Sequence, residues 1–127
     1  MILQTIVKGK ATGKTIKTNS PINFLGTVDK KTGTIQDKNH ELYQKSVGNS
    51  ILVFPHGIGS SVGAYTIYSL KSNDSAPLAM ICQKADLTVA SGCALANIPL
   101  VIVNKEQFDS ISNDSELSLD TESQTIS

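Results

Sequence analysis

Arginine and tryptophan are both absent from this chain of 127 residues, and its charges of opposite sign cancel. All eleven basic residues are lysines, and eleven acidic residues balance them. Proteins that bind nucleic acids normally show a basic excess, so this class of function is disfavoured. Arginine is also the residue that usually grips carboxylates and phosphates through two parallel hydrogen bonds. A chain without it must hold an anionic substrate with backbone N–H groups, with lysine, or with a group on another chain.

Long apolar runs and metal-binding patterns are missing as well. No run approaches the roughly 18 apolar residues that suggest a membrane span, and no secretory signal is evident, so we expect a soluble, cytoplasmic protein. The two cysteines, Cys82 and Cys93, are separated by ten residues, which matches no metal-ligand spacing, and a disulfide is disfavoured in the cytosol. We expect both to be small core residues, with no metal held by this chain.

The length and a hydrophobic content of 39% allow a single domain, residues 1–127, with one sizeable core. Short apolar runs and alternation predict mostly β structure, with strands over 1–7, 15–18, 51–54, 78–83 and 98–103 and an extended piece over 87–89. Residues 9–13 are predicted as the turn of a hairpin between the first two strands. The spacing of apolar residues predicts a helix over 61–70, and 91–96 is predicted as a helical turn.

The last part of the chain, 109–127, allows two interpretations. It contains five acidic residues, six serines and no basic residue, a composition typical of a loose, disordered tail. However, Leu117 and Leu119 alternate with polar residues, and Thr125-Ile126 could pair with them across a turn at Glu122-Ser123. A closing hairpin and a loose tail both remain open.

The most informative stretch is VFPHGIGSSVGAYTIYSL, residues 53–70. A short apolar strand stops at Pro55, a glycine-rich turn follows, and two adjacent serines, Ser60 and Ser61, precede a segment with helical spacing. Backbone N–H groups at the start of a helix have no intrahelical partner and can hold an oxyanion or a phosphate. The stretch therefore predicts a serine hydroxyl presented in an anion-stabilising setting. Combined with the small size and the lack of arginine, it suggests part of an active site rather than a whole one.

Two other interpretations compete for the same serine. Ser60 could merely cap the helix, a position that serine fills well. His56 could act as a base on Ser60, which would suggest a serine hydrolase. However, a nucleophile elbow has the pattern G-x-S-x-G, and residue 58, two positions before Ser60, is isoleucine where that pattern requires glycine. A hydrolase is therefore disfavoured, and His56 is better interpreted as a turn residue.

Three blocks carry a resemblance to a known family: FLGTVDKKTGTIQDKNHELYQKSV (24–47), ILVFPHGIGSSVGAYTIYSLK (51–71) and SGCALANIPLV (91–101). In this order and spacing they resemble the small subunit of the aconitase X family. The resemblance implies an α/β, mainly β, swivelling β/β/α domain like the mobile fourth domain of aconitase. It also implies a heterodimer with a large subunit that carries a [4Fe-4S] cluster. The implied reaction is the hydro-lyase step that dehydrates (R)-5-phosphomevalonate to trans-anhydromevalonate 5-phosphate in the archaeal mevalonate route to isoprenoids.

The resemblance also implies roles for residues of the G-x-G-S-S turn. Ser60 matches the serine whose oxygen accepts the proton in aconitase-like enzymes. A free hydroxyl is a poor base, so its alkoxide needs oxyanion donors, for which the backbone N–H groups of Ser61 and Val62 are the candidates. Gly59 and Gly63 would keep side chains out of the way. The side chain of Ser61 is expected to cap the helix or to bind substrate.

The sequence departs from the family's relatives after the serine pair. Aconitase and its isopropylmalate relatives follow the pair with Arg-Glu, whereas Val62-Gly63 follows here, so we expect the partner to supply the missing positive charge. Residues 29–33 are predicted as a type I turn with Gly33 at the left-handed position. Asp29, in this second recognisable loop, either orients a ligand or caps a turn.

Two alternative functions remain. The chain could serve an aconitase X dehydratase of another hydroxy acid, such as cis-3-hydroxyproline, although bacterial enzymes of that kind tend to have cysteine at the position of Ser61. It could also be a non-catalytic anion-binding module whose serine only caps a helix.

Overall fold

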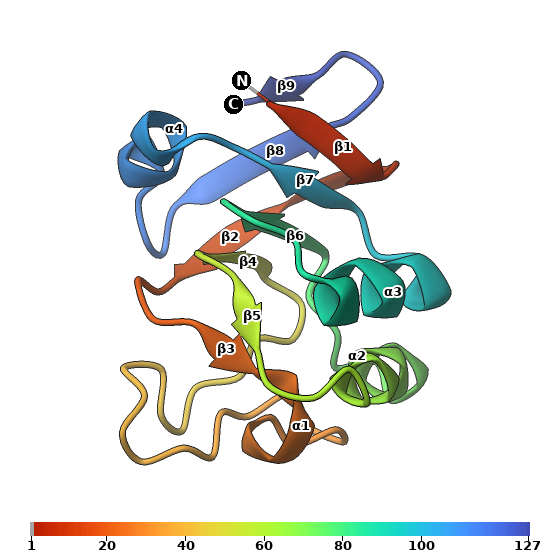
Figure 1. Ribbon diagram of the computed structural model, residues 1–127. Helices are drawn as coiled ribbons and strands as arrows, with labels where there is room; N and C mark the ends of the chain where they lie inside the picture. The colour runs from red at the N-terminus through yellow and green to blue at the C-terminus, as the bar shows by residue number, and fades with distance from the viewer. Residues whose placement is uncertain (1) are drawn as a thin grey trace.

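The computed structural model describes residues 2–127, and its main feature is a seven-stranded sheet in the order β1-β7-β6-β4-β2-β8-β9 (Figure 1). The strands of this sheet are β1 (Gln4–Val7), β2 (Lys10–Lys17), β4 (Ile51–Phe54), β6 (Ala79–Cys82), β7 (Leu100–Ile102), β8 (Glu116–Asp120) and β9 (Thr125–Ile126). A separate two-stranded sheet pairs β3 (Ile22–Asn23) with β5 (Gly57–Ile58). The helices are α1 (Phe24–Thr27), α2 (Gly63–Ser72), α3 (Leu87–Ala96) and α4 (Lys105–Ser110).

The centre of the large sheet is parallel. Strands β2, β4, β6 and β7 run in one direction, while β1 is antiparallel to β7 and β8 is antiparallel to β2. Helix α2 connects β4 to β6 and helix α3 connects β6 to β7, so each forms a β-α-β crossover. Figure 1 shows the two helices side by side on one face of the sheet. Strands β4 and β6 are fully buried, as expected for parallel strands covered on both faces.

The eight-residue strand β2 divides the sheet into two layers. Its first half, Lys10–Lys14, pairs with β8, and its second half, Thr15–Lys17, pairs with β4. One core cluster lies under α2 and α3 and includes Leu52, Met80 and Ile67. The second cluster lies on the other face of the sheet and joins side chains of β4, β6 and β7 to β8 and α4, with Phe108 and Leu119 among its members. The resulting β/β/α arrangement confirms the predicted fold class.

The predicted hairpin over the first 18 residues is wrong. Strand β1 pairs with β7, and residues 10–17 form one continuous strand. Gly13 does not mark a turn: a Cβ there would lie 2.8 Å from Cδ1 of Leu78, so the glycine makes room for a packed side chain. Only Gly9 bends the chain between the strands, and its N–H donates to Thr121 Oγ1 at 2.9 Å.

The predicted extended piece over 87–89 is also wrong, because these residues begin the ten-residue helix α3. The β-branched side chains of Thr88 and Val89 favour strand locally, but tertiary packing overrides that weak preference. A Cβ on Gly92 would lie 2.7 Å from Cδ1 of Ile67 in α2. The small residues of 91–96 therefore allow α3 to pack closely against α2. This close packing requires the segment to be a regular helix.

The C-terminal residues form the hairpin alternative. Strands β8 and β9 pair antiparallel, with Leu119 opposite Ile126 and Asp120 opposite Thr125. Helix α4, which the sequence did not suggest, begins after Asn104, whose Oδ1 accepts from the Gln107 N–H at 2.8 Å. Leu119 is buried against the core, so apolar burial orders this acidic segment despite its composition.

Cys82 and Cys93 are both free and buried, which confirms their prediction as core residues. Within residues 2–127, no helix combines the length and apolar character that crossing a membrane requires.

Candidate active site

Residues 57–62, here the Ser60 turn, lie at the carboxyl ends of the central parallel strands. Ligands bind at these ends in open α/β sheets. Strand β4 ends at Phe54, β5 follows, and the turn leads into α2. The neighbouring strand β6 ends at Cys82 and leads into α3. Figure 1 shows that α2 and α3 both start on the side of the molecule where β3 and β5 pair. Three separate segments, around Asn23, Ser60 and Asp86, therefore meet at one place.

The glycines of the turn are required by their surroundings. Gly59 has a φ of +94°, a conformation that favours glycine. A Cβ there would lie 2.5 Å from Oδ1 of Asn23. A Cβ on Gly57 would lie 2.8 Å from both Oδ1 of Asp86 and Cγ2 of Val89. Both glycines let the backbone of the turn pass close to side chains of β3 and α3, and that contact sets the position of Ser60.

Ser60 is exposed, and its hydroxyl is oriented by the backbone. Its Oγ accepts a hydrogen bond from the Val62 N–H at 3.2 Å. Its carbonyl oxygen accepts from the Gly63 N–H at 3.0 Å and from Thr88 Oγ1 at 3.3 Å, which ties the turn to α3. Helix α2 begins at Gly63, two residues later than predicted, with Val62 as its N-cap residue. Ser60 is thus not the N-cap of this helix.

The backbone N–H groups of Ser61 and Val62, which the sequence predicts as oxyanion donors, do not bond to backbone carbonyls of residues 2–127; their role as oxyanion donors stays a prediction. The N–H groups of Gly63 and Ala64 are already bonded to the carbonyls of Ser60 and Ser61, at 3.0 and 3.1 Å. The Val62 N–H points at Ser60 Oγ, and the Ser61 N–H has no acceptor among residues 2–127. The side chain of Ser61 is exposed and does not cap α2, so the capping role predicted for it is wrong.

Gly63 has a packing role in addition to the one predicted. A Cβ there would lie 3.1 Å from Cγ2 of Thr88 and 3.3 Å from the backbone nitrogen of Leu25. The first turn of α2 therefore fits closely between α1 and α3. A Cβ at this position would require Thr88 or the backbone at Leu25 to shift by a few tenths of an ångström.

Asp29 caps the turn at 29–33. Its Oδ1 accepts from the N–H groups of Lys31 and Thr32, at 2.8 and 3.3 Å, and its Oδ2 accepts from Gln36 Nε2 at 3.3 Å. Asp29 also lines, together with Val62, an open depression of about 460 Å³ beside the start of α2. A ligand-orienting role for Asp29 remains a prediction.

Asn23 and Asp86 lie at the candidate site, and the sequence analysis did not point to either of them. Oδ1 of each is enclosed and receives no hydrogen bond from the residues that the structure describes. Asp86 directly precedes α3 as its N-cap residue but accepts no cap hydrogen bond. No motif marks Asn23, and the position of Asp86 only becomes informative once 87–96 is known to be a helix.

Comparison with known proteins matches the whole chain, residues 1–127, to the family described as the aconitase X swivel domain. The chain belongs to this family. The swivel domain is 43% identical over 109 residues to the phosphomevalonate dehydratase small subunit of Methanosarcina acetivorans, covering 85% of this chain and 76% of that protein. It is 40% identical over 121 residues to the subunit of the same name from Methanococcoides burtonii, covering 94% and 88%. The crystal structure of Thermococcus kodakaraensis aconitase X in its holo-form matches with a TM-score of 0.91 and 37% identity, covering 97% of this chain and 92% of that one.

The other residues of the swivel domain considered for chemistry, His56, Cys82 and Cys93, form their contacts with groups other than Ser60. His56 Nδ1 lies 2.9 Å from the carbonyl oxygen of Gly57 and makes no hydrogen bond to Ser60, so the geometry does not support the hydrolase alternative. Burial, with a smaller contribution from the charge of Asp86, raises the pKa of the Cys82 thiol to about 12. Burial also raises the pKa of Cys93. Both thiols are therefore protonated at neutral pH and unsuited to binding a metal.

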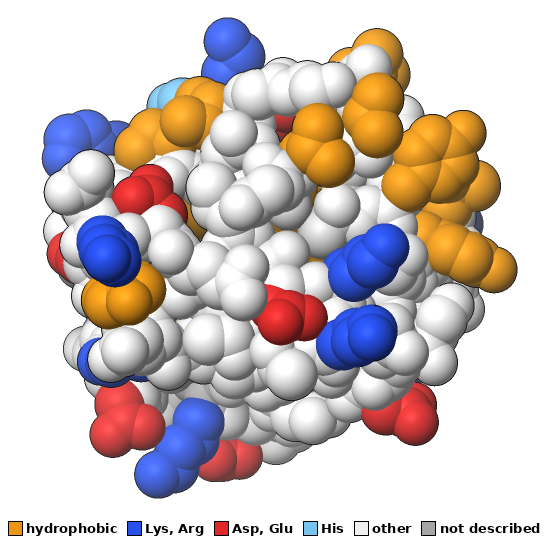
Figure 2. All heavy atoms as spheres, turned by 90° about the horizontal axis from the view of Figure 1, so that it is seen from below, with side chains coloured by type: hydrophobic (Ala, Val, Ile, Leu, Met, Phe, Trp, Pro, Cys, Tyr) orange, Lys and Arg blue, Asp and Glu red, His pale blue; other side chains and the backbone are white. Residues whose placement is uncertain are grey.

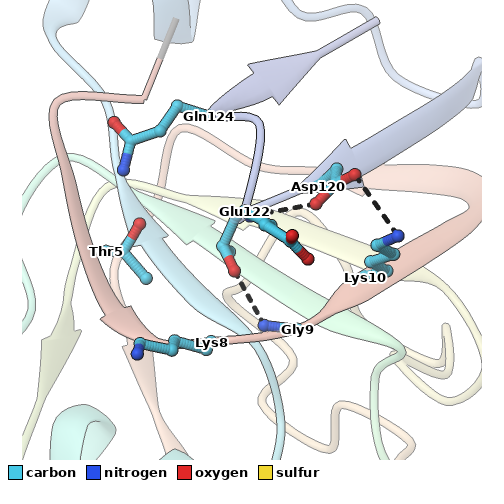
Figure 3. Close-up of a pocket in the computed structure, with 8 residues that line it drawn as sticks. Thr5, Lys8, Gly9, Lys10, Asp120, Glu122 and Gln124 are labelled. Atoms are coloured by element: carbon cyan, nitrogen blue, oxygen red, sulfur yellow. Dashed lines mark hydrogen bonds and ion pairs between the residues drawn. The ribbon is translucent and has the colours of Figure 1, made fainter.

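A larger depression, of about 580 Å³, lies far along the sheet between β1, β2 and the turn after β8 (Figure 3). Among the residues that line it, Lys10 pairs with Asp120 at 3.6 Å, and the Gly9 N–H donates to Thr121 Oγ1. None of the residues predicted for the site lines it. We assign the candidate site to the Ser60 turn because the predicted site residues and the unpaired oxygens of Asn23 and Asp86 lie there.

Proposed function

We propose that this swivel domain is the small subunit of a phosphomevalonate dehydratase. The enzyme would remove water from (R)-5-phosphomevalonate and release trans-anhydromevalonate 5-phosphate. The observation that carries the proposal is the exposed Ser60 hydroxyl, held by the Val62 N–H on a turn that only glycines allow. The names of relatives at 40–43% identity support the choice of substrate.

In this proposal Ser60 is the proton acceptor. Its Oγ takes a proton from the carbon next to the substrate carboxylate, the electron pair of that C–H bond forms the new double bond, and the hydroxyl group leaves from the adjacent carbon. The negative charge on Ser60 Oγ before proton transfer needs stabilisation. The N–H groups of Val62 and Ser61 are the donors, and a well-placed oxyanion donor contributes about 2.7–4 kcal/mol.

We also propose that a [4Fe-4S] cluster belongs to the partner subunit. The described residues of this chain contain no group of three or more histidine, cysteine, aspartate or glutamate side chains that could hold a metal. Cys82 Sγ donates to the Val101 carbonyl, and Cys93 Sγ contacts Met80 Sδ, both within the core. The chain's own residues therefore do not fit a cluster. A cluster on the partner would supply a Lewis acid for the departing hydroxyl.

The exposure of Ser60 supports dependence on a large subunit. Oxyanion donors stabilise charge most strongly where water is excluded, and this turn is open to solvent in the isolated chain. A second subunit that covers the turn would exclude water and supply the groups that bind the substrate carboxylate and phosphate. We propose a heterodimer that forms the active site at its interface.

The test compares two adjacent serines in the reconstituted enzyme. Ser60→Ala should abolish turnover of (R)-5-phosphomevalonate while the assembly and the spectrum of the cluster stay unchanged. Ser61→Ala, the matched control, should lose about tenfold or less, equivalent to about 1.4 kcal/mol. Near-normal activity of Ser60→Ala would remove this residue from the mechanism. Turnover of cis-3-hydroxyproline in place of phosphomevalonate would support the alternative dehydratase.

A further inference from the structure

Two enclosed acceptor oxygens lie against the Ser60 turn without a donor. Oδ1 of Asp86 and Oδ1 of Asn23 receive no hydrogen bond from residues 2–127. A Cβ added to Gly57 would lie 2.8 Å from Oδ1 of Asp86, and a Cβ added to Gly59 would lie 2.5 Å from Oδ1 of Asn23. Both oxygens therefore lie close to the turn. Unpaired buried acceptors are rare in folded proteins, so each requires an explanation.

The side chain of Asp86 does not cap the helix that it precedes. Its carboxylate accepts no cap hydrogen bond from α3, and its Oδ2 is not enclosed, so the half-buried side chain can be reached from outside. The ion pairs found among the described residues are Lys10–Asp120, Lys14–Asp114 and Lys105–Asp109, all distant from the turn in the fold. The chain also lacks arginine. Within residues 2–127, no ion pair neutralises the negative charge of Asp86.

The substrate cannot be the partner of Asp86. The proposed function, on which this inference rests, gives the substrate a carboxylate and a phosphate. An uncompensated carboxylate beside the Ser60 turn would repel both groups, and the repulsion is strongest where water is excluded. A cation beside Asp86 removes this repulsion, and the same cation favours the negative charge that develops on Ser60 Oγ.

The surroundings of Asp86 fit a protein surface rather than a free ion. Leu87, directly after Asp86, is 74% exposed, and Ile58 and Val62, on either side of the turn, are 47% and 51% exposed. Figure 2 shows exposed hydrophobic side chains gathered along the upper and right-hand parts of the face seen from below, the side on which α2 and α3 lie in Figure 1. Exposed apolar side chains that gather on one face mark a protein–protein interaction site, and a charge left unpaired among them calls for a partner of opposite charge.

We infer that the face formed by Ile58, Val62 and Leu87 around Asp86, here the Asp86 face, docks on the large subunit, and that a cationic side chain of that subunit pairs with the Asp86 carboxylate. Arginine suits this position best, because its planar fork can bind both carboxylate oxygens. The contact places an arginine, a residue that this chain lacks, beside the turn that carries Ser60.

The test measures association of the two purified subunits by calorimetric titration under anaerobic conditions, at low and at high ionic strength. Asp86→Asn keeps the shape of the side chain and removes its charge. It should weaken association about tenfold or more at low salt and should flatten the salt dependence. The matched control is Asp114→Asn, an exposed aspartate in a surface ion pair, which should associate like the wild type. Far-UV circular dichroism checks that both variants are folded.

A second pair of variants tests the apolar part of the Asp86 face. Leu87→Ser should weaken association, whereas Leu3→Ser, a leucine of similar exposure (67%) beside the N-terminus, should not. The inference would be overturned if Asp86→Asn associated as tightly as the wild type at both salt concentrations. If that variant also showed a raised KM for phosphomevalonate, Asp86 would be a substrate contact instead. Either result leaves the proposed function intact. A wild-type chain that does not associate with the large subunit would overturn both.

Discussion

Replacing Gly59 by alanine tests whether the backbone of the turn positions Ser60. The residue has a φ of +94°, and a side chain in such a conformation costs about 1–3 kcal/mol. The new Cβ would also lie 2.5 Å from Oδ1 of Asn23, closer than van der Waals contact permits. Either Asn23 or the turn must move, which adds to the cost. We expect Gly59→Ala to lower the free energy of unfolding by about 2–4 kcal/mol.

Gly26 provides the matched control. Its φ is +83°, close to that of Gly59, but a Cβ there would meet no atom within 4 Å. Gly26→Ala therefore measures the backbone strain alone, which we expect to be about 1–2 kcal/mol. The difference between the two variants isolates the contact with Asn23. Adding Asn23→Ala to Gly59→Ala should recover most of that difference, because the shorter side chain makes room for the Cβ.

The measurement is urea unfolding followed by far-UV circular dichroism, since the chain has no tryptophan to serve as a fluorescent probe. The reconstituted enzyme then gives the functional result. Gly59→Ala should lower kcat by at least tenfold, whereas the exposed Gly26→Ala should change it much less. Equal destabilisation by both alanines, with no recovery from Asn23→Ala, would refute the proposed contact between the turn and β3.

The structure supports two further predictions about stability. The ordinary pKa of a cysteine thiol is 9.0. In the folded chain, burial raises the pKa of Cys82 to about 12, and it also raises the pKa of Cys93. Above pH 9 the unfolded chain loses these protons before the folded one, so the free energy of unfolding should fall by up to about 1.4 kcal/mol per pH unit for each thiol. Replacing both by alanine should flatten this slope in urea titrations between pH 8 and 10 (about one unit on either side of the thiol pKa), and an unchanged slope would contradict the assignment. Lys17 Nζ donates to the carbonyls of Phe108 and Ile111 at 2.7 and 2.6 Å, so Lys17→Met should destabilise the chain by about 1.5–3 kcal/mol. Lys14→Met, which breaks only an exposed ion pair, should stay within about 1 kcal/mol, and equal effects would show that the Lys17 bonds add nothing.

Patterns confined to a few neighbouring residues predicted their local structure well. The apolar runs at 51–54 and 98–103 contain strands β4 and β7, because an apolar run of that length has to be buried. The turn at 29–33 forms around Asp29 and Gly33, whose φ is +75°, because those side chains favour it locally. The turn at Ser60 was predicted for the same reason.

Predictions failed where a distant contact decides the local structure. Gly13 was interpreted as a turn residue, but it lies within β2 because Leu78 occupies the space of its side chain. The segment from Leu87 was interpreted as extended, but it is helical because Gly92 lets α3 approach Ile67 of α2. No local pattern reports either contact, since the residues concerned are far apart in the sequence.

The sequence alone determined where the candidate serine, Ser60, lies and which backbone groups surround it, because a strand, a glycine turn and a helix in succession are specified by adjacent residues. It also determined that no arginine of this chain can bind the substrate carboxylate or phosphate, since the chain contains none. Only the tertiary structure decided which side chains lie against the turn that carries that serine. Packing brings Asn23 from β3 and Asp86 from the start of α3 to the same turn and leaves them unpaired, because long-range contacts follow from the fold and not from local preference.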